Sequence, residues 1–170
     1  MSTSSCAHLH VHSEYSLLDG ACKIEALAAR AAQFEQPALG LTDHGVMNGA
    51  VELYKAARKH GVKPIIGCEV YFVDDHAAPA QDRTERNHLT LLASDDEGYR
   101  NLVKLSSAGF LQGLQRGKPN VDLGLMERHA QGVMCQDLET LKSRSGLMAP
   151  TSMACRNEWI TEVLFTLHVA

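Results

Sequence analysis

Short apolar runs alternate along this chain with longer segments in which apolar residues recur every three or four positions. The helical spacing predicts amphipathic helices over residues 23–36, 46–60 and 95–112, and a shorter helix over 122–130. The apolar runs predict strands over residues 7–11, 38–41, 64–73, 88–93 and 132–135. Two polar segments are predicted to be loops, residues 74–87 and the basic segment 113–120.

The predicted helices fall between most of the predicted strands. Such alternation indicates an α/β fold with a largely parallel sheet or barrel. The 170 residues are enough for one domain with a buried core. The sequence contains no internal repeat and no low-complexity segment.

Composition and charge narrow the function classes without selecting one. The net charge of −4 gives no general sign of nucleic-acid binding, although a local basic patch stays open. Because no apolar run approaches roughly 18 residues and the N-terminus does not resemble a signal peptide, we expect a cytoplasmic protein without a membrane helix. The five cysteines are scattered and form no Cys-x-x-Cys pair, which argues against a disulfide framework or a structural zinc knot.

Histidine is the unusual component, with nine in the chain. Because side chains on a strand point to alternate faces, His10 and His12 share one face of the first predicted strand. Two imidazoles on one face can bind a divalent metal ion or a pair of ions, although an isolated His-x-His is more often a surface pair. His8 shares this face and is a candidate for supporting the ligands.

Further polar candidates follow predicted strands, where reactive side chains collect in parallel α/β folds. Asp19 is either a ligand or an ordinary turn residue. His44 follows the strand 38–41 and is the better metal candidate of its motif. Asp43 is a candidate for accepting the other ring N–H of a liganding histidine, and Thr42 or Asp43 can alternatively cap the next helix.

Glu69 lies in the middle of the apolar run 64–73. A carboxylate there costs free energy unless it is paired or bound to a metal, so a ligand and a buried ion pair are the two interpretations. His88 opens the fourth predicted strand and is a further candidate ligand. Of the remaining histidines, His60 is expected at a helix C-terminus. The sequence identifies no partner for the others, which are His76, His129 and His168.

These candidates comprise four histidines and two or three carboxylates. Nitrogen and oxygen ligands without thiolate favour Zn²⁺, Mn²⁺ or Fe²⁺. Because the candidates outnumber the three protein ligands of a mononuclear catalytic site, two or three metal ions are expected. Clustered metals of this kind hydrolyse phosphoesters, since one activates water while the others neutralise the phosphate.

The motifs that hold these residues resemble the PHP (polymerase and histidinol phosphatase) domain, and more narrowly the N-terminal part of bacterial replicative DNA polymerase III alpha subunits. They are His-x-His, Leu-Asp-Gly, Thr-Asp-His-Gly and Gly-x-Glu-x-Tyr, within a similarity that covers residues 6–134. The resemblance implies a distorted (β/α)₇ barrel with a trinuclear metal site. Its implied ligands are His10, His12, Asp19, His44, Glu69 and His88.

The resemblance also implies an activity and partners. Family members that keep the metal cluster are associated with a 3′→5′ exonuclease that removes mismatched primer ends. Zn²⁺ or Mn²⁺ would then be the cofactor, with a DNA primer 3′ end and other replicase subunits as partners in the full-length proteins. No membrane partner is expected.

The sequence departs from the family pattern after Cys135. Residues 136–170 do not match the segments that supply the family's remaining ligands, and His168 is not preceded by Asp-x. We therefore expect the N-terminal portion of a PHP domain over residues 1–135, lacking its C-terminal strands, and a divergent tail over 136–170. The polymerase palm, fingers and clamp-binding parts are not expected in this chain.

Three functional hypotheses stay open at this point. The first is a truncated alpha-subunit PHP domain, the second a free-standing phosphoesterase for a small phosphate ester such as histidinol phosphate, and the third a non-catalytic module that docks polymerase partners. Because barrel closure and the last ligands are not recognised, we expect the chain alone to be a weak or inactive enzyme.

Overall fold

The structure is a computed structural model that describes residues 6–17, 19–78 and 86–136. Its helices are α1 (Ile24–Gln33), α2 (Ala50–Lys59), α3 (Asp96–Leu111) and α4 (Leu123–Arg128). Its strands are β1 (Ala38–Leu41), β2 (Lys63–Phe72), β3 (Asn87–Ala93), β4 (Leu114–Gln115), β5 (Lys118–Val121) and β6 (Val133–Cys135). None of the described helices is long and apolar enough to cross a membrane.

The long strand β2 lies at the centre of a mixed six-stranded sheet. β1 and β5 pair with β2 in parallel, β1 along its first half and β5 at its last two residues. β3 pairs with β2 antiparallel, and β6 and β4 pair antiparallel with β3 and β5. The α/β prediction is confirmed, and β2 is placed so that its last two residues pair with β3 and β5 at once.

The prediction of a largely parallel sheet is wrong for β3, β4 and β6. A parallel pair needs a crossover connection, usually a helix, whereas strands joined without one return antiparallel. No helix is predicted between β2 and β3, and their antiparallel pairing follows from that.

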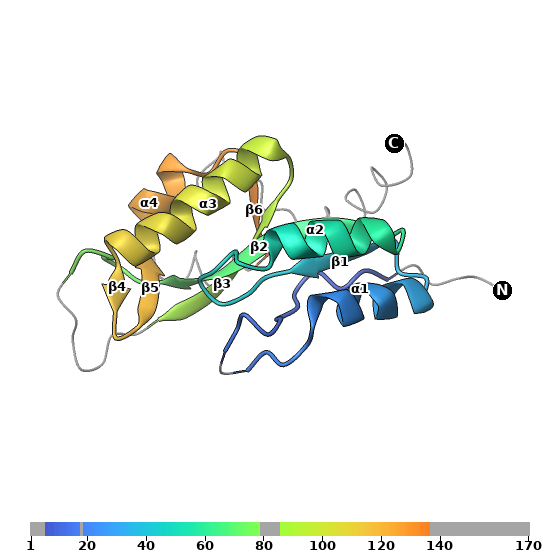
Figure 1. Cartoon of the computed structure of the whole chain (residues 1–170). Coiled ribbons are helices and arrows are strands. Elements are labelled where there is room, and N and C mark those ends of the chain that lie inside the picture. The colour runs from blue at the N-terminus through green and yellow to red at the C-terminus, as the bar shows by residue number, and fades with distance from the viewer. Residues whose placement is uncertain (1–5, 18, 79–85, 137–170) are drawn as a thin grey trace.

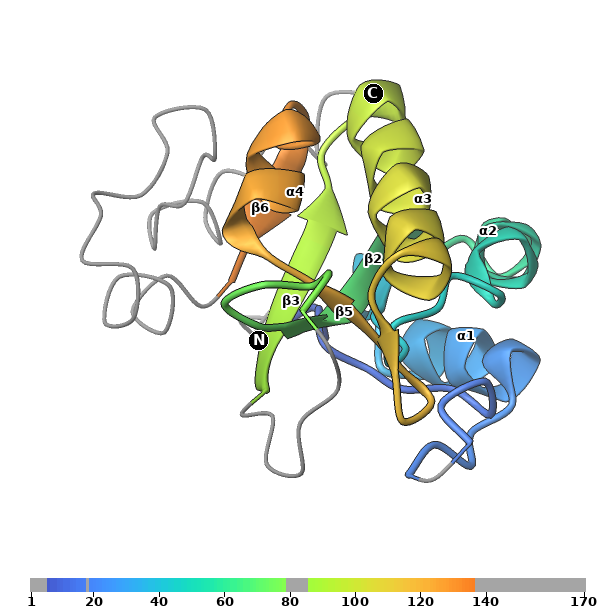
Figure 2. The ribbon, with the colours of Figure 1, turned by 90° about the vertical axis from the view of Figure 1, so that its left-hand side faces the viewer.

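Two apolar clusters hold the helices against this sheet. α1 and α2 pack on each other and on β1, because residues such as Ile24, Ala28 and Leu53 repeat at helical spacing and are fully buried. α3 and α4 pack on the other strands through residues such as Leu102 and Met126. Figures 1 and 2 both show the α1–α2 pair set apart from α4.

The first predicted strand is instead an extended segment alongside β1. It forms one parallel bridge, between His8 and Leu39, and two backbone hydrogen bonds, in which Gly40 N donates to His8 O and Thr42 N donates to Val11 O. These contacts are enough to place the His-x-His motif next to the end of β1.

The segment 113–120 is a β-hairpin rather than the predicted loop. Its two turn residues, Arg116 and Gly117, both have positive φ, of 50° and 76°. A two-residue turn of that kind matches the twist of a hairpin. The prediction missed it because arginine rarely adopts positive φ.

Candidate metal centre

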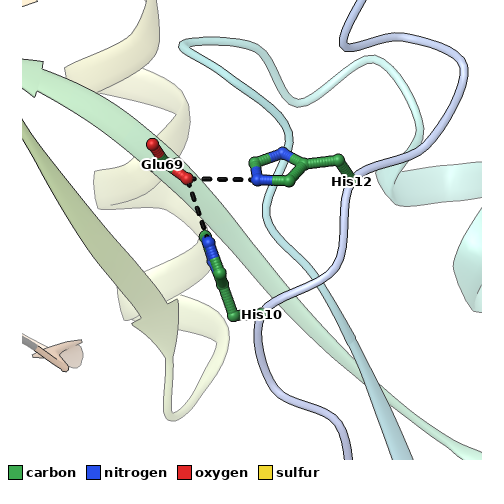
Figure 3. Close-up of side chains that lie close together, drawn as sticks. All are labelled: His10, His12 and Glu69. Atoms are coloured by element: carbon green, nitrogen blue, oxygen red, sulfur yellow. Dashed lines mark ion pairs between the residues drawn. The ribbon is translucent and has the colours of Figure 1, made fainter. Parts of the chain in front are cut away.

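Glu69 is the centre of the site, with a side chain that is only 5% exposed. One carboxylate oxygen, Oε2, lies 3.2 Å from Nε2 of His10 and 3.2 Å from Nε2 of His12. Figure 3 shows these two rings approaching the same oxygen from the N-terminal segment. The carboxylate is therefore paired, as its position in an apolar strand requires.

The other oxygen of Glu69 faces two more histidines. Oε1 lies 3.2 Å from Nδ1 of His44 and is hydrogen-bonded to Nδ1 of His88. Nε2 of His44 is in turn 2.7 Å from Oδ2 of Asp19. The structure thus brings together all six residues that the sequence proposed as ligands. We call these six residues the Glu69 cluster: His10, His12, Asp19, His44, Glu69 and His88.

The Glu69 cluster contains three overlapping groups that can each hold an ion. In each group three ligand atoms lie within 4.8 Å of one another, and the groups are His10–His12–Glu69, His12–Asp19–His44 and His44–Glu69–His88. Nδ1 of His44 is buried and makes no hydrogen bond within the described residues. An unsatisfied imidazole nitrogen among nitrogen and oxygen donors fits a bound divalent metal ion.

Backbone contacts around β2 position these side chains. Beyond the end of β1 the chain stays parallel to β2, because Glu69 N donates to Asp43 O and Gly45 N donates to Glu69 O. His88 lies on β3, directly opposite Tyr71 of β2. The site is therefore built where several strands meet, and Glu69 and His44 are locked in register.

Hydroxyl groups orient His10 from two sides. Oγ1 of Thr42 lies 3.0 Å from Nδ1 of His10, and Oγ1 of Thr90 lies 3.1 Å from the same nitrogen. Contacts at Nδ1 leave Nε2 pointing at Glu69. Thr42 thus supports a histidine and does not cap α2, which begins at Ala50 after Gly49.

Asp43 does not accept a ring N–H, contrary to the prediction. Its buried carboxylate accepts hydrogen bonds from Ser13 N at 2.6 Å, Ser13 Oγ at 2.7 Å and Ser16 Oγ at 2.7 Å. Ser16 Oγ also lies 3.3 Å from Nδ1 of His12 and accepts from His44 N at 3.2 Å. Asp43 therefore acts on two histidines through Ser16, which the sequence analysis did not single out.

The pKa values of His12 and Asp19 are shifted in directions that suit metal binding. Burial and the neighbouring His44 hold the pKa of His12 below its usual value, although Glu69 partly offsets them. The hydrogen bond from His44 lowers the pKa of Asp19. His12 is then neutral and Asp19 ionised near pH 7, which are the forms that bind metal.

Cys68 is adjacent to Glu69 but is not a ligand. Burial raises the pKa of its thiol to about 12, and the thiol donates to the Asp43 carbonyl at 3.6 Å. Cys68 also belongs to none of the groups of described ligand atoms that lie within 4.8 Å of one another. The side-chain atoms that gather around Glu69 are nitrogen and oxygen, as the sequence predicted.

Several other predictions about histidine can be compared with the structure. His60 follows α2 as predicted and contacts Glu25 at 2.9 Å. His76 has a partner after all, since its Nδ1 lies 2.6 Å from Oδ2 of Asp122. His8 is bound to β1 through its backbone, and none of the side-chain contacts described in the Glu69 cluster involves it. His168 lies outside the described residues.

Tyr71 and Lys118 also adjoin the site, and the sequence analysis missed both. The Tyr71 ring lies 5.8 Å from the His44 ring and 4.9 Å from the His88 ring, centroid to centroid. Tyr71 shares a face of β2 with Glu69, two residues before it, so strand periodicity was a usable signal. Lys118 had no such signal, because its hairpin was not predicted.

Comparisons with known proteins give consistent matches. A family model described as PHP domain matches residues 8–158. DNA polymerase III subunit alpha of Chlamydia trachomatis is 45% identical over 130 residues, which are 75% of this chain and 10% of that protein. The Treponema pallidum subunit of the same name is 44% identical over 138 residues, 79% of this chain and 12% of that protein.

Similarity to solved structures is more distant. An amidohydrolase from Chromobacterium violaceum is 18% identical, with a TM-score of 0.41, and the match covers 83% of this chain and 51% of that one. The chain spans about a tenth of the length of the curated relatives that it matches, 10% in the Chlamydia protein.

Proposed function

The chain belongs to the PHP domain family, and we propose that its Glu69 cluster binds two or three divalent metal ions and serves phosphoester hydrolysis. The observation that carries this proposal is the convergence of four imidazoles on one buried carboxylate. The imidazoles come from the N-terminal segment, the turn after β1 and strand β3, which are far apart in the sequence.

Ion pairing alone does not account for this arrangement. A single carboxylate cannot neutralise four imidazolium groups, and the low pKa of His12 indicates a neutral ring. Imidazoles and carboxylates that face one another form a set of metal ligands, and nitrogen and oxygen donors favour Zn²⁺ or Mn²⁺. Three overlapping ligand groups support two or three ions.

One side of the site is open to a substrate. The side chains of His10, Asp19 and His88 are 44%, 53% and 49% exposed, whereas Glu69 beneath them is buried. A phosphate group can therefore approach the exposed side of the ligands. Metal ions bound there would supply an activated water and neutralise the phosphate charge.

The curated relatives suggest in which protein and on which substrate this reaction takes place. We propose that the chain is the PHP portion of a replicative polymerase alpha subunit, with a DNA primer 3′ end as substrate and other replicase subunits as partners. The activity would be of the 3′→5′ exonuclease type. The division into a PHP portion at 1–135 and a tail at 136–170, and the cytoplasmic location, remain part of this proposal.

Metal analysis combined with two hydrolysis assays tests the proposal on the purified chain. We expect two or three equivalents of Zn²⁺ or Mn²⁺ per chain and weak metal-dependent trimming of a mismatched primer 3′ end. Weak turnover is expected because the family's remaining ligands are not recognised after Cys135. Preference for histidinol phosphate would favour a free-standing phosphoesterase, and metal binding without turnover on either substrate would favour a docking module.

A chain that binds no divalent metal would overturn the proposal. The comparison variant is His129→Gln, because His129 ends α4 and belongs to none of the three ligand groups. Its metal content should equal that of the wild type, whereas His12→Gln and His44→Gln should each lose metal.

A further inference from the structure

The β4–β5 hairpin lies directly against the Glu69 cluster. A Cβ atom built on Gly45, the residue after His44, would lie 2.5 Å from Cγ of Pro119. Asn120 of the same hairpin pairs with Tyr71 of β2. The basic segment that the sequence analysis left without a role therefore forms one wall of the site.

Lys118 is part of this hairpin and directs its ammonium group toward Tyr71 of β2. Nζ donates a hydrogen bond to the Tyr71 hydroxyl at 2.8 Å and lies 4.7 Å from the centroid of that ring. The same ring contacts His44 and His88. A single aromatic side chain thus separates the lysine cation from two proposed ligands.

Within the part of the chain that the structure describes, no carboxylate pairs with the ammonium group of Lys118. Among the ion pairs of the described residues, none involves Lys118, and its hydrogen-bond partner is the Tyr71 hydroxyl. A cation held beside a metal-ligand cluster without a counter-ion is available to an anion. A phosphate is such an anion, and lysine binds it as a point charge.

The hairpin is held in place by side-chain hydrogen bonds from Arg86, Asn120 and Gln115. Nε of Arg86 donates to Oδ1 of Asn120 at 2.9 Å, and Nδ2 of Asn120 donates to Gly113 O at 3.0 Å. Nε2 of Gln115 donates to Ala78 O at 2.7 Å. These bonds fix the backbone on both sides of Lys118, so its cation is preorganised.

We propose that Lys118, positioned by the Tyr71 hydroxyl, binds a non-bridging phosphate oxygen of the substrate at the Glu69 cluster. This proposal rests on the phosphoester function proposed above and names one residue that recognises the substrate. Lys118 supplies positive charge next to Tyr71, whose ring contacts His44 and His88, and it holds the phosphate without taking part in proton transfer.

The test compares Lys118→Met with Lys118→Arg and with Lys55→Met, a control on the exposed face of α2. Inorganic phosphate is titrated calorimetrically into each protein, both metal-free and loaded with Zn²⁺ or Mn²⁺. We expect Lys118→Met to weaken phosphate binding by about tenfold or more, which is the usual scale for losing a charged hydrogen bond. Lys118→Arg should recover part of the loss, and Lys55→Met should match the wild type.

Hydrolysis of bis(p-nitrophenyl) phosphate separates binding from the chemical step. Lys118→Met should raise KM by about tenfold with a smaller change in kcat, because uniform binding is lost. Its metal content should equal that of the wild type, since Lys118 is not a ligand. Tyr71→Phe should give an intermediate rise in KM, because the lysine loses its hydrogen bond but keeps its charge.

Failure of this inference differs from failure of the proposed function. Equal phosphate affinity in the wild type and Lys118→Met overturns the role of Lys118, whether or not metal binds. Absence of metal from the wild type and from every variant overturns the proposed function. In that case the phosphate titration of the metal-free proteins still tests whether Lys118 binds phosphate. If Lys118→Met does not fold, phosphate must still shift the Lys118 ammonium resonance in the wild type, and no shift overturns the inference.

Discussion

At the scale of single residues, the site depends on Glu69 more than on any histidine. Each imidazole contacts one oxygen of this carboxylate, so removing Glu69 disconnects four ligands at once. The sequence predicted its importance because burial of a carboxylate in an apolar strand demands a partner. Residue type and strand position were sufficient here.

Glu69→Gln is expected to reduce metal affinity by at least about tenfold. Loss of a residue that merely supports a ligand costs about 10–100-fold, and loss of a ligand should cost no less. Metal content after dialysis at controlled free Zn²⁺ measures the effect. Glu127→Gln on the exposed surface of α4 is the control, and equal metal content in the two variants would contradict the role of Glu69.

Asp43 is the second decisive carboxylate, although its described hydrogen bonds come from Ser13 and Ser16 and not from a proposed metal ligand. Asp43→Ala leaves Ser13 N, Ser13 Oγ and Ser16 Oγ without their acceptor. At about 1–3 kcal/mol for a buried unsatisfied group, we expect a loss of about 3 kcal/mol in the free energy of unfolding. Urea denaturation of the metal-free protein measures it.

The control for Asp43→Ala removes a single hydrogen bond. Ser106 Oγ donates to Gly45 O at 2.9 Å, and Ser106→Ala should cost only about 1 kcal/mol. If Asp43→Ala lowered the free energy of unfolding no more than Ser106→Ala does, the hydrogen bonds to the Asp43 carboxylate would not be stabilising the fold. The sequence could not predict these partners, because Ser13 and Asp43 are 30 positions apart and no periodicity relates them.

At the scale of elements, local periodicity predicted the helices and the buried strands well. Such patterns depend on which face of a short segment is buried. The predicted bounds of β1 and β6 differ from the observed bounds by at most one residue. Strand direction and the β4–β5 hairpin were not predicted, because pairing depends on distant residues and on one arginine with positive φ.

Substitutions at two glycines, Gly117 in the hairpin and Gly45 against it, distinguish the cost of backbone strain from the cost of a packing clash. Gly117→Ala meets no atom within 4 Å but must adopt φ of +76°, so it should cost about 1–2 kcal/mol. Gly45→Ala has φ of +67° and also meets Pro119, so it should cost more and displace the hairpin. Thermal unfolding measures both costs, and the reverse order would contradict the packing described here.

Asp122 makes the N-terminus of α4 sensitive to pH. Burial raises the pKa of its carboxyl, but hydrogen bonds from His76 and from backbone N–H groups outweigh this and lower the pKa below the usual 3.8. The carboxylate therefore stabilises the folded state above the unfolded pKa, and this stabilisation is lost as the pH falls through the lower, folded pKa.

Asp122→Asn should consequently be less stable than the wild type at pH 7. The difference in free energy of unfolding should shrink as the pH falls below about 4, because Asp122 becomes protonated and is then uncharged, as the asparagine is at every pH. Urea denaturation of both proteins between pH 7 and pH 3 measures it. A difference that grows as the pH falls below about 4 would contradict the lowered pKa of Asp122.

At the scale of the whole molecule, the Glu69 cluster adds side-chain contacts between parts that also meet through the pairing of β1 with β2. His10 and His12 belong to the N-terminal segment beside β1, whereas Glu69 and His88 belong to β2 and β3. α1 with α2 and α3 with α4 pack in two separate apolar clusters. Metal ions in the Glu69 cluster would tie these two halves together.

Removal of metal is therefore expected to lower the Tm of the chain. A ligand that binds only the folded state stabilises it by about 2.7 kcal/mol at a free concentration of 100 times Kd, so a chelator should remove an amount of this order. Calorimetry with Zn²⁺ and with EDTA measures the shift. Because Glu69→Gln lacks the central ligand, its Tm should hardly change between the two conditions. A wild-type Tm that is insensitive to the chelator would mean that these histidines hold the fold together without metal.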